Sequence, residues 1–158
     1  MVWIRTKTAK EITIRTSREA LRALLLDVAG CGRMMPGVEE LEQVGDGLYH
    51  FRLAEVSNGV VKFRPDYVAR YDVSDPDAIT WEPHGEHNFR SWGTFHVLDG
   101  ASPEEVVLRI DMRSEANVDV ARVVVVLIEP FAQKETAEVT TGFLAAIKGR
   151  LETAGVPR

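Results

Sequence analysis

Residues 11–15 (Glu-Ile-Thr-Ile-Arg) alternate between polar and apolar side chains, a pattern typical of a strand with one buried face. Ser17 is a suitable helix N-cap, and apolar residues then recur at helical spacing, so we predict an amphipathic helix over residues 18–28. Gly30 ends this helix. Residues 31–37 end in Pro-Gly, which favours one further helical turn followed by a reversal of the chain.

Short strands separated by turns are predicted over residues 38–116. Gly-Asp-Gly at residues 45–47 lies between two apolar runs and predicts a hairpin. Apolar and polar residues alternate over residues 61–73, where Pro65 should mark a bulge or an edge position. Together with the first strand, this segment supplies about seven strands, and their short turns favour antiparallel neighbours.

The C-terminal region is predicted to form one long helix over residues 130–153, with Pro130 in its first turn, where the missing N–H is not needed. Residues 119–128 are ambiguous, because consecutive valines favour a strand while their place before the helix permits a helical entry. We expect the apolar run at residues 123–128 to be buried against the sheet. The alternative is an exposed patch that docks on a membrane surface or a partner.

This order of elements predicts an α+β fold. We expect a curved antiparallel sheet of about seven strands that grips the long C-terminal helix, with two short helices after the first strand, because each element then hides one apolar side. The chain has 158 residues and a mass of 17.6 kDa, so a single domain over residues 1–158 can bury a core without a disulfide or a metal.

Composition and charge exclude several classes of function. The formal net charge is −5 and no cluster of basic residues occurs, which argues against a nucleic-acid partner. Cys31 is the single cysteine, so neither an intramolecular disulfide nor a multi-cysteine zinc site is available. The longest apolar run is far shorter than the roughly 20 residues of a membrane span. We therefore expect a cytoplasmic protein without a transmembrane segment, a metal or a cofactor.

Five segments carry a resemblance to a known superfamily. They are Thr-Ser-Arg-Glu-Ala-Leu-Arg-Ala-Leu-Leu at residues 16–25, Met-Pro-Gly-Val-Glu at 35–39, Gly-Asp-Gly-Leu-Tyr at 45–49, Ser-Trp-Gly-Thr-Phe-His-Val at 91–97 and Phe-Leu-Ala-Ala-Ile-Lys-Gly-Arg-Leu-Glu at 143–152. In this order and spacing, over about residues 10–153, they resemble the helix-grip superfamily of START domains, birch-pollen-allergen-like proteins and polyketide cyclases or dehydratases. The stretch at residues 36–47 is most similar to the branch of carbon-monoxide-dehydrogenase G-like proteins, which is associated with apolar molecules such as quinones.

The resemblance implies a ligand cavity between the sheet and the last helix. Cavities of this kind are mostly apolar, with a few polar groups that orient the ligand. The same residues would otherwise simply fill a core. The predicted ligand-binding residues are Tyr49, Phe51, Phe63, Tyr67, Tyr71, Trp81, Phe95, Leu108, Phe143 and Ile147.

Candidate residues for chemistry are few. His84 and His87 lie in a loop beside Pro83 and lack the spacing of a helical zinc site, so no metal is expected there. His96 is the one candidate catalytic residue. It falls on the strand parity opposite Phe95 and should point outward, and only a one-residue slip would make it a cavity base.

Three other sets of residues bear on the chemistry of the cavity. Arg90 is a candidate for holding an anionic head group at the cavity rim. Glu135 and Glu138 lie near the predicted start of the last helix and are explained by the helix dipole. Cys31 is expected to be a buried, inert thiol.

Three functions follow. The first is a binder or carrier of an apolar small molecule that is lipid-, polyketide- or quinone-like. The second is a polyketide cyclase or dehydratase, in which a cavity base removes a proton. The third is an accessory or interaction module of a larger enzyme complex, with a protein partner or a second copy of the chain. The predicted inward wall offers tyrosines and lacks an assigned histidine or carboxylate, which favours the binder over the enzyme.

Overall fold

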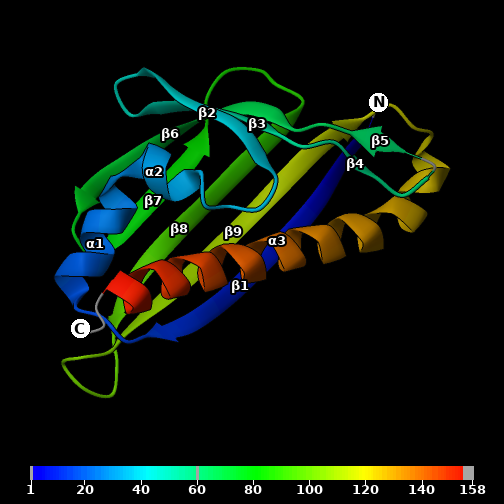
Figure 1. Cartoon of the computed structure of the whole chain (residues 1–158). Helices are drawn as coiled ribbons and strands as arrows, with labels where there is room; N and C mark the ends of the chain where they lie inside the picture. The colour runs from blue at the N-terminus through cyan, green and yellow to red at the C-terminus, as the bar shows by residue number, and fades with distance from the viewer. Residues whose placement is uncertain (1, 60, 155–158) are drawn as a thin grey trace.

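The protein, described by a computed structural model over residues 2–59 and 61–154, is built on one antiparallel sheet curved around a long helix (Figure 1). The sheet has seven strands, in the spatial order β1 (Val2–Ile14), β9 (Val106–Val118), β8 (Phe89–Asp99), β7 (Ala78–Pro83), β6 (Asp66–Asp75), β3 (Leu48–Leu53) and β2 (Val38–Gly45). A separate two-stranded sheet consists of β4 (Val56–Ser57) and β5 (Lys62–Phe63).

Helical elements complete the fold. Two short helices, α1 (Arg18–Leu26) and α2 (Val28–Gly32), follow β1, and a 3-10 turn, η1 (Arg122–Val124), leads into α3 (Val125–Ala154). The long helix α3 runs along β1 in front of the sheet (Figure 1). The α+β fold with about seven antiparallel strands, two short helices and a long C-terminal helix is thereby confirmed.

The first strand is longer than its sequence pattern indicates. β1 begins at Val2 and pairs with β9 along its whole length. Its inward positions near the start include Thr6 and Thr8, which are buried although they are polar. Because threonine occupies these core-facing positions, the first half of the strand does not show an alternation of apolar and polar residues.

The long helix also begins earlier than predicted. α3 starts at Val125, which resolves the ambiguous segment as η1 followed by helix and leaves Pro130 inside α3. The N–H that Pro130 lacks would have bonded the carbonyl of Val126, a residue that is exposed, so water can take its place.

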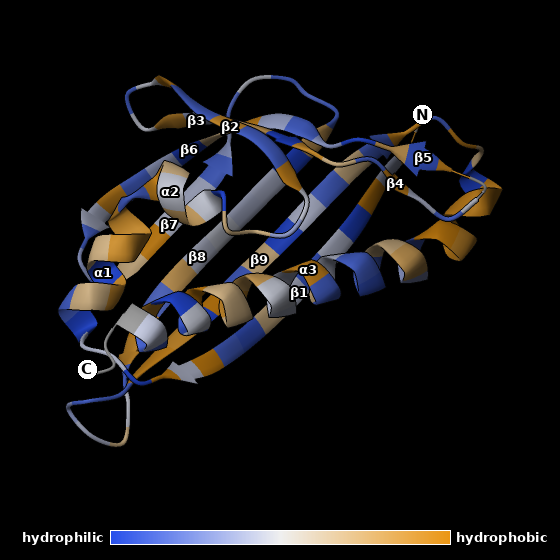
Figure 2. Ribbon diagram, in the orientation of Figure 1, coloured by the Kyte–Doolittle hydropathy of each residue, from blue (hydrophilic) through white to orange (hydrophobic). Residues whose placement is uncertain are grey.

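In the apolar run at residues 123–128, which we expected to be buried, Ile128 is buried and Val124 and Val125 are half-buried, but the other three side chains are exposed. The side chains of Val123 and Leu127 are 78% and 73% exposed. Figure 2 shows apolar colouring at this end of α3. The helical period explains the difference, because only one side of a single helix can face the sheet.

Side-chain contacts hold α3 along the edge strand β1. The side-chain amide of Gln133 accepts a hydrogen bond from the backbone N–H of Lys7 (3.0 Å) and donates one to its carbonyl (2.6 Å). The ammonium of Lys148 donates to the carbonyl of Thr13 (2.8 Å). β1 is an edge strand, so these backbone groups on its free side have no strand to pair with. The bonds to α3 use them and set the distance between the helix and the sheet.

Among the described residues, the buried apolar side chains form two clusters. In the larger one, Leu108 and Ile147 are fully buried between the sheet and the C-terminal half of α3. The smaller one joins Ile4, Val118 and Ile128 at the other end. Among the described residues, no helix combines the length and the apolar character needed to cross a bilayer.

Candidate functional site: an apolar cavity under the long helix

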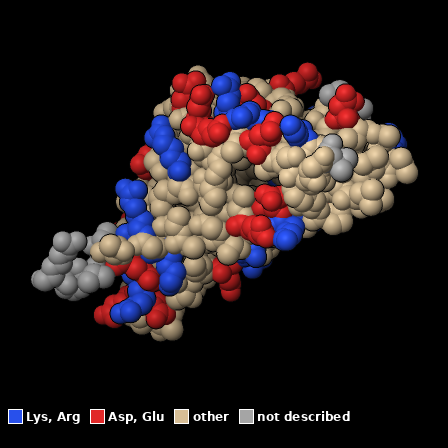
Figure 3. Space-filling view, turned by 45° about the vertical axis from the view of Figure 1, so that its right-hand side comes forward, with Lys and Arg blue, Asp and Glu red and all other residues tan. Residues whose placement is uncertain are grey.

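A cavity of about 190 Å³ lies between the concave face of the sheet and α3, and members of both core clusters line it. In the view of Figure 3 the surface is hollowed within a largely uncharged area, with acidic side chains beside the hollow. An apolar cavity of about 150 Å³ is large enough to hold benzene, whereas sites for drug-sized ligands measure roughly 300–1,000 Å³. The enclosed space therefore suits about one aromatic ring, and a larger ligand would extend through the opening.

Most of the predicted ligand-binding residues surround this cavity. Seven of the ten line it, namely Phe51, Phe63, Tyr67, Tyr71, Trp81, Phe95 and Phe143. Their rings form a nearly continuous wall. The ring centroids of Tyr71 and Trp81 lie 5.7 Å apart, those of Trp81 and Phe95 5.3 Å apart, and those of Phe95 and Phe143 5.9 Å apart. These distances are typical of favourable aromatic pairs.

The other three predicted residues lie outside the cavity lining. Leu108 and Ile147 are fully buried in the core, where α3 packs directly on the sheet. Tyr49 is half-buried and packs edge-on against the ring of Tyr71 at 5.4 Å. Along α3 the cavity ends between Phe143 and Ile147. The sequence pattern identified the inward face of each strand but carried no information on where along that face the helix touches it.

A glycine makes room for the indole of Trp81. Gly93 pairs with Trp81 across β7 and β8, and a Cβ atom at residue 93 would overlap the Cζ2 of the indole. The indole therefore lies on the bare backbone of β8. Its Nε1 donates a buried hydrogen bond of 3.0 Å to the hydroxyl of Ser91.

The cavity also contains polar residues that sequence analysis missed. Thr6, Ser91 and Ser114 line it from the sheet, and the hydroxyls of Thr6 and Ser114 share a buried hydrogen bond of 2.5 Å. A signal for two of them was present, since Ser91 and Ser114 share the inward strand parity of Phe95 and Ile110. Thr140 lines the cavity from α3 and donates a hydrogen bond to the carbonyl of Thr136, one turn earlier in the helix (2.8 Å).

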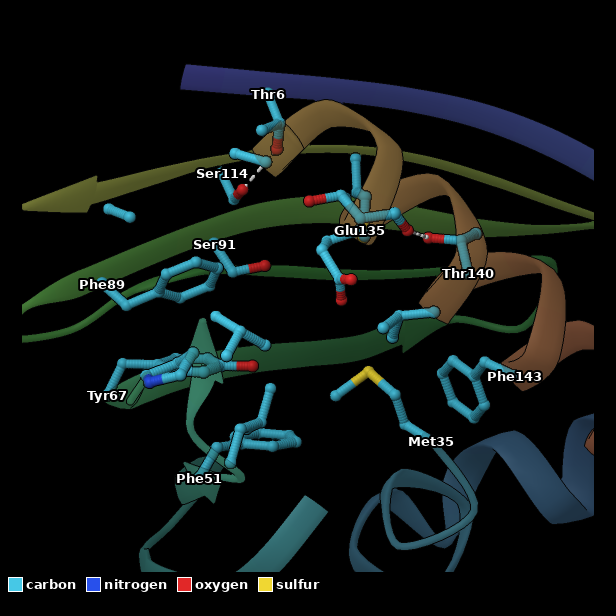
Figure 4. Close-up of a pocket in the computed structure, with 18 of the residues that line it drawn as sticks. Thr6, Met35, Phe51, Tyr67, Phe89, Ser91, Ser114, Glu135, Thr140 and Phe143 are labelled. Carbon is cyan, nitrogen blue, oxygen red and sulfur yellow. Dashed lines mark hydrogen bonds between the residues drawn. The ribbon is translucent and has the colours of Figure 1, made fainter. Parts of the chain in front are cut away.

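Glu135 is the main correction to the expected chemistry. Its half-buried side chain points from α3 into the cavity (Figure 4). The helix-dipole explanation is wrong for this residue, because α3 starts at Val125 and Glu135 lies almost three turns after that N-terminal start. Figure 4 shows Glu135 and Ser91 pointing toward the same part of the cavity from opposite walls.

The tyrosines of the wall are neutral phenols. Burial raises the pKa of Tyr67, and burial together with the neighbouring Tyr67 and Cys31 raises the pKa of Tyr71. Burial likewise raises the pKa of the Cys31 thiol to about 12. At neutral pH these groups are therefore protonated, so they can donate hydrogen bonds but do not act as bases.

Arg90 and His96 lie on the outer face of the sheet, away from the cavity. Arg90, which we expected at the rim, stacks on the ring of Trp3 at 3.9 Å and contacts the carboxylate of Glu115 at 3.3 Å. His96 has its Nε2 3.4 Å from the carboxylate of Asp111. Strand parity is the reason, because Ser91 and the other inward residues of β8 alternate with these two. His96 thus has the outward orientation predicted for it and lies on the far side of the sheet from any ligand in the cavity.

The described residues contain no group of three or more histidine, cysteine, aspartate or glutamate side chains placed to hold a metal ion. No protein-family model and no curated protein matches the sequence.

Solved structures match the fold over nearly the whole chain. A START superfamily protein from Mycobacterium smegmatis aligns with a TM-score of 0.72 and 14% identity, covering 94% of this chain and 98% of that one. The Zhui aromatase/cyclase from a Streptomyces species aligns with a TM-score of 0.67 and 18% identity, covering 97% and 99%. The di-domain aromatase/cyclase BexL aligns with a TM-score of 0.61 and 17% identity, covering 96% of this chain and 48% of BexL. The chain therefore has the helix-grip fold, and at these identities the likeness concerns the fold alone.

Proposed function

We propose that this protein binds an apolar small molecule in the cavity between the sheet and α3. The observation that carries the proposal is the aromatic wall of Tyr71, Trp81, Phe95 and Phe143 around an enclosed space of about 190 Å³. A void of this size inside a close-packed core lowers stability when it is empty, so its presence favours a ligand-binding role. The named fold neighbours, a START superfamily protein and aromatase/cyclases, support the same class of function.

The gain from burying a ligand is sufficient without polar contacts. Removing about 200 Å² of apolar ligand surface from water contributes about 5 kcal/mol at about 25 cal/mol per Å², before the costs of association. A single-ring compound can therefore bind through the wall alone with a dissociation constant of about 0.2 mM at best. One aromatic ring, bearing a chain that leaves through the opening, fits the cavity better than a fully enclosed lipid.

Two measurements test the binding function. Native mass spectrometry of freshly purified protein, followed by organic extraction, should reveal a recurring apolar compound at a fixed stoichiometry. Titration with 4-propylphenol, followed by calorimetry, should show one site per chain. Ala132 lines the cavity from α3, so Ala132→Phe should weaken this binding at least tenfold. Ala145 is exposed on the same helix, and Ala145→Phe is the matched control.

A protein that is empty in every preparation and binds no aromatic probe would contradict the proposal. The interaction module of a larger complex would then be the remaining function. Equal binding by the two phenylalanine variants would show that the probe binds elsewhere.

Glu135 favours a second candidate, a cyclase- or dehydratase-like enzyme. Such an enzyme needs a group that accepts a proton within hydrogen-bond reach of its substrate, and the carboxylate of Glu135 points into the cavity (Figure 4). The test is conversion of a short aromatic β-diketone ester, followed by chromatography. Turnover that Glu135→Gln abolishes supports the enzyme, whereas binding without turnover supports the carrier.

A further inference from the structure

Glu135 gives the cavity a charged end. Its carboxylate is the only charged group among the described residues that line the cavity, which include no lysine, arginine or histidine. Within the described chain, Glu135 makes no hydrogen bond and no ion pair. The neighbouring Lys134 points to Glu138 instead, with 3.9 Å between the ammonium and the carboxylate. An acceptor without a partner therefore faces the apolar space.

Ser91 lies on the wall opposite Glu135 and supplies the complementary group. Its hydroxyl oxygen accepts the hydrogen bond from the indole of Trp81, which leaves the hydroxyl proton free to be donated. Figure 4 shows this hydroxyl and the carboxylate of Glu135 directed at the same region from β8 and α3. A ligand whose polar groups reach both walls can donate to Glu135 and accept from Ser91.

The charge of the site excludes some ligands and favours others. A carboxylate or phosphate head group would meet the like charge of Glu135 and find no cation in the described lining. A quinone offers carbonyl acceptors only, so it cannot satisfy a carboxylate. A hydroxyl or an amine can donate to Glu135, and a hydrogen bond to a charged acceptor is stronger than one between neutral groups.

We propose that the cavity selects an apolar ligand whose head group donates a hydrogen bond, a phenol, an alcohol or an amine, with Glu135 as the acceptor and Ser91 as the opposing donor. This inference rests on the proposed binding function and adds the chemical class of the ligand. It excludes fatty acids and other anionic apolar molecules.

The test compares ligands that differ in one group. The probes are 4-propylphenol and 4-propyltoluene, in which a methyl group replaces the hydroxyl, together with 4-propylbenzoate and 4-propylbenzylamine. Dissociation constants are measured by calorimetry at low salt for the wild type, Glu135→Leu and Glu135→Gln. The exposed Glu138 serves for the matched control Glu138→Gln, and thermal unfolding checks that each variant is folded.

The preference for the phenol is the dissociation constant of the methyl analogue divided by that of the phenol. We expect this ratio to be about tenfold larger for the wild type than for Glu135→Leu, which corresponds to about 1.4 kcal/mol. The benzoate should bind at least tenfold more tightly to Glu135→Gln than to the wild type, and Glu138→Gln should change neither ratio. If Glu135→Leu loses more affinity for the benzylamine than for the phenol, the site favours an amine ligand, and the reverse identifies a hydroxyl.

Two results would overturn the inference in different ways. If the phenol and the toluene bind and their ratio is the same in the wild type and in Glu135→Leu, Glu135 does not select the head group, and the binding function stands. If no probe binds to the wild type, the binding function itself fails, and the selectivity fails with it.

Discussion

Filling the cavity from α3 should stabilise the protein, and Ala132 is the position at which to fill it. Ala132 is half-buried, lines the cavity and lies next to the smaller core cluster. Ala132→Leu adds three carbons, each worth about 0.8 kcal/mol when buried, and the restricted side chain loses about 0.5–1 kcal/mol of rotamer entropy. The helix propensities of the two residues are similar, so the net gain should be about 1.5 kcal/mol.

Unfolding in guanidinium measures this gain, provided that the m-value is unchanged. The midpoint temperature of thermal unfolding should rise by about 3–6 °C for a chain of this length. The control is Ala145→Leu, because Ala145 is exposed on the same helix and its substitution should change the free energy of unfolding by less than about 0.5 kcal/mol. A loss of about 1–3 kcal/mol in Ala132→Leu, as in an overpacked core, would refute the reasoning, since it would mean that no space exists beneath α3.

Three further predictions concern the wall of the cavity, the thiol and the outer face of the sheet. Gly93→Ala places a Cβ atom against the indole of Trp81 and should cost about 1–3 kcal/mol in chemical denaturation, and an unchanged midpoint would mean that the indole does not rest on this backbone. Burial raises the pKa of Cys31 to about 12, so at pH 8 a thiol reagent should label it at the rate of unfolding, and rapid labelling of the folded protein would contradict its burial. A hydrogen bond from His50 lowers the pKa of Asp66 in the folded state. The stabilisation from this bond is therefore present above the unfolded pKa of about 4 and is lost as the pH falls through the folded pKa. Asp66→Asn should make the free energy of unfolding fall less steeply at acid pH, and an unchanged pH dependence would contradict the role of this pair.

Strand parity was sufficient to identify most of the cavity wall. Phe51, Tyr67 and Phe95 face inward because side chains alternate along a strand whatever surrounds it, and the same rule assigned His96 to the outer face. Arg90 also obeys this rule, since its parity is opposite to that of the inward Ser91 and Phe95, and it therefore lies on the outer face and not at the rim. The element order similarly determined the fold class, since each apolar face needed a cover.

What the sequence alone determined is thus which elements form and which face each strand buries, because these depend on spacing within a few residues. The tertiary structure decided where α3 touches the sheet and where it leaves space, which separates the packed Ile147 from the cavity-lining Phe143, one turn apart. It also decided that Glu135 points into the cavity, because the helix begins at Val125 and its rotation is set by contacts with β1 such as that between Gln133 and the backbone of Lys7. Those contacts join residues more than a hundred positions apart, and no local pattern encodes them.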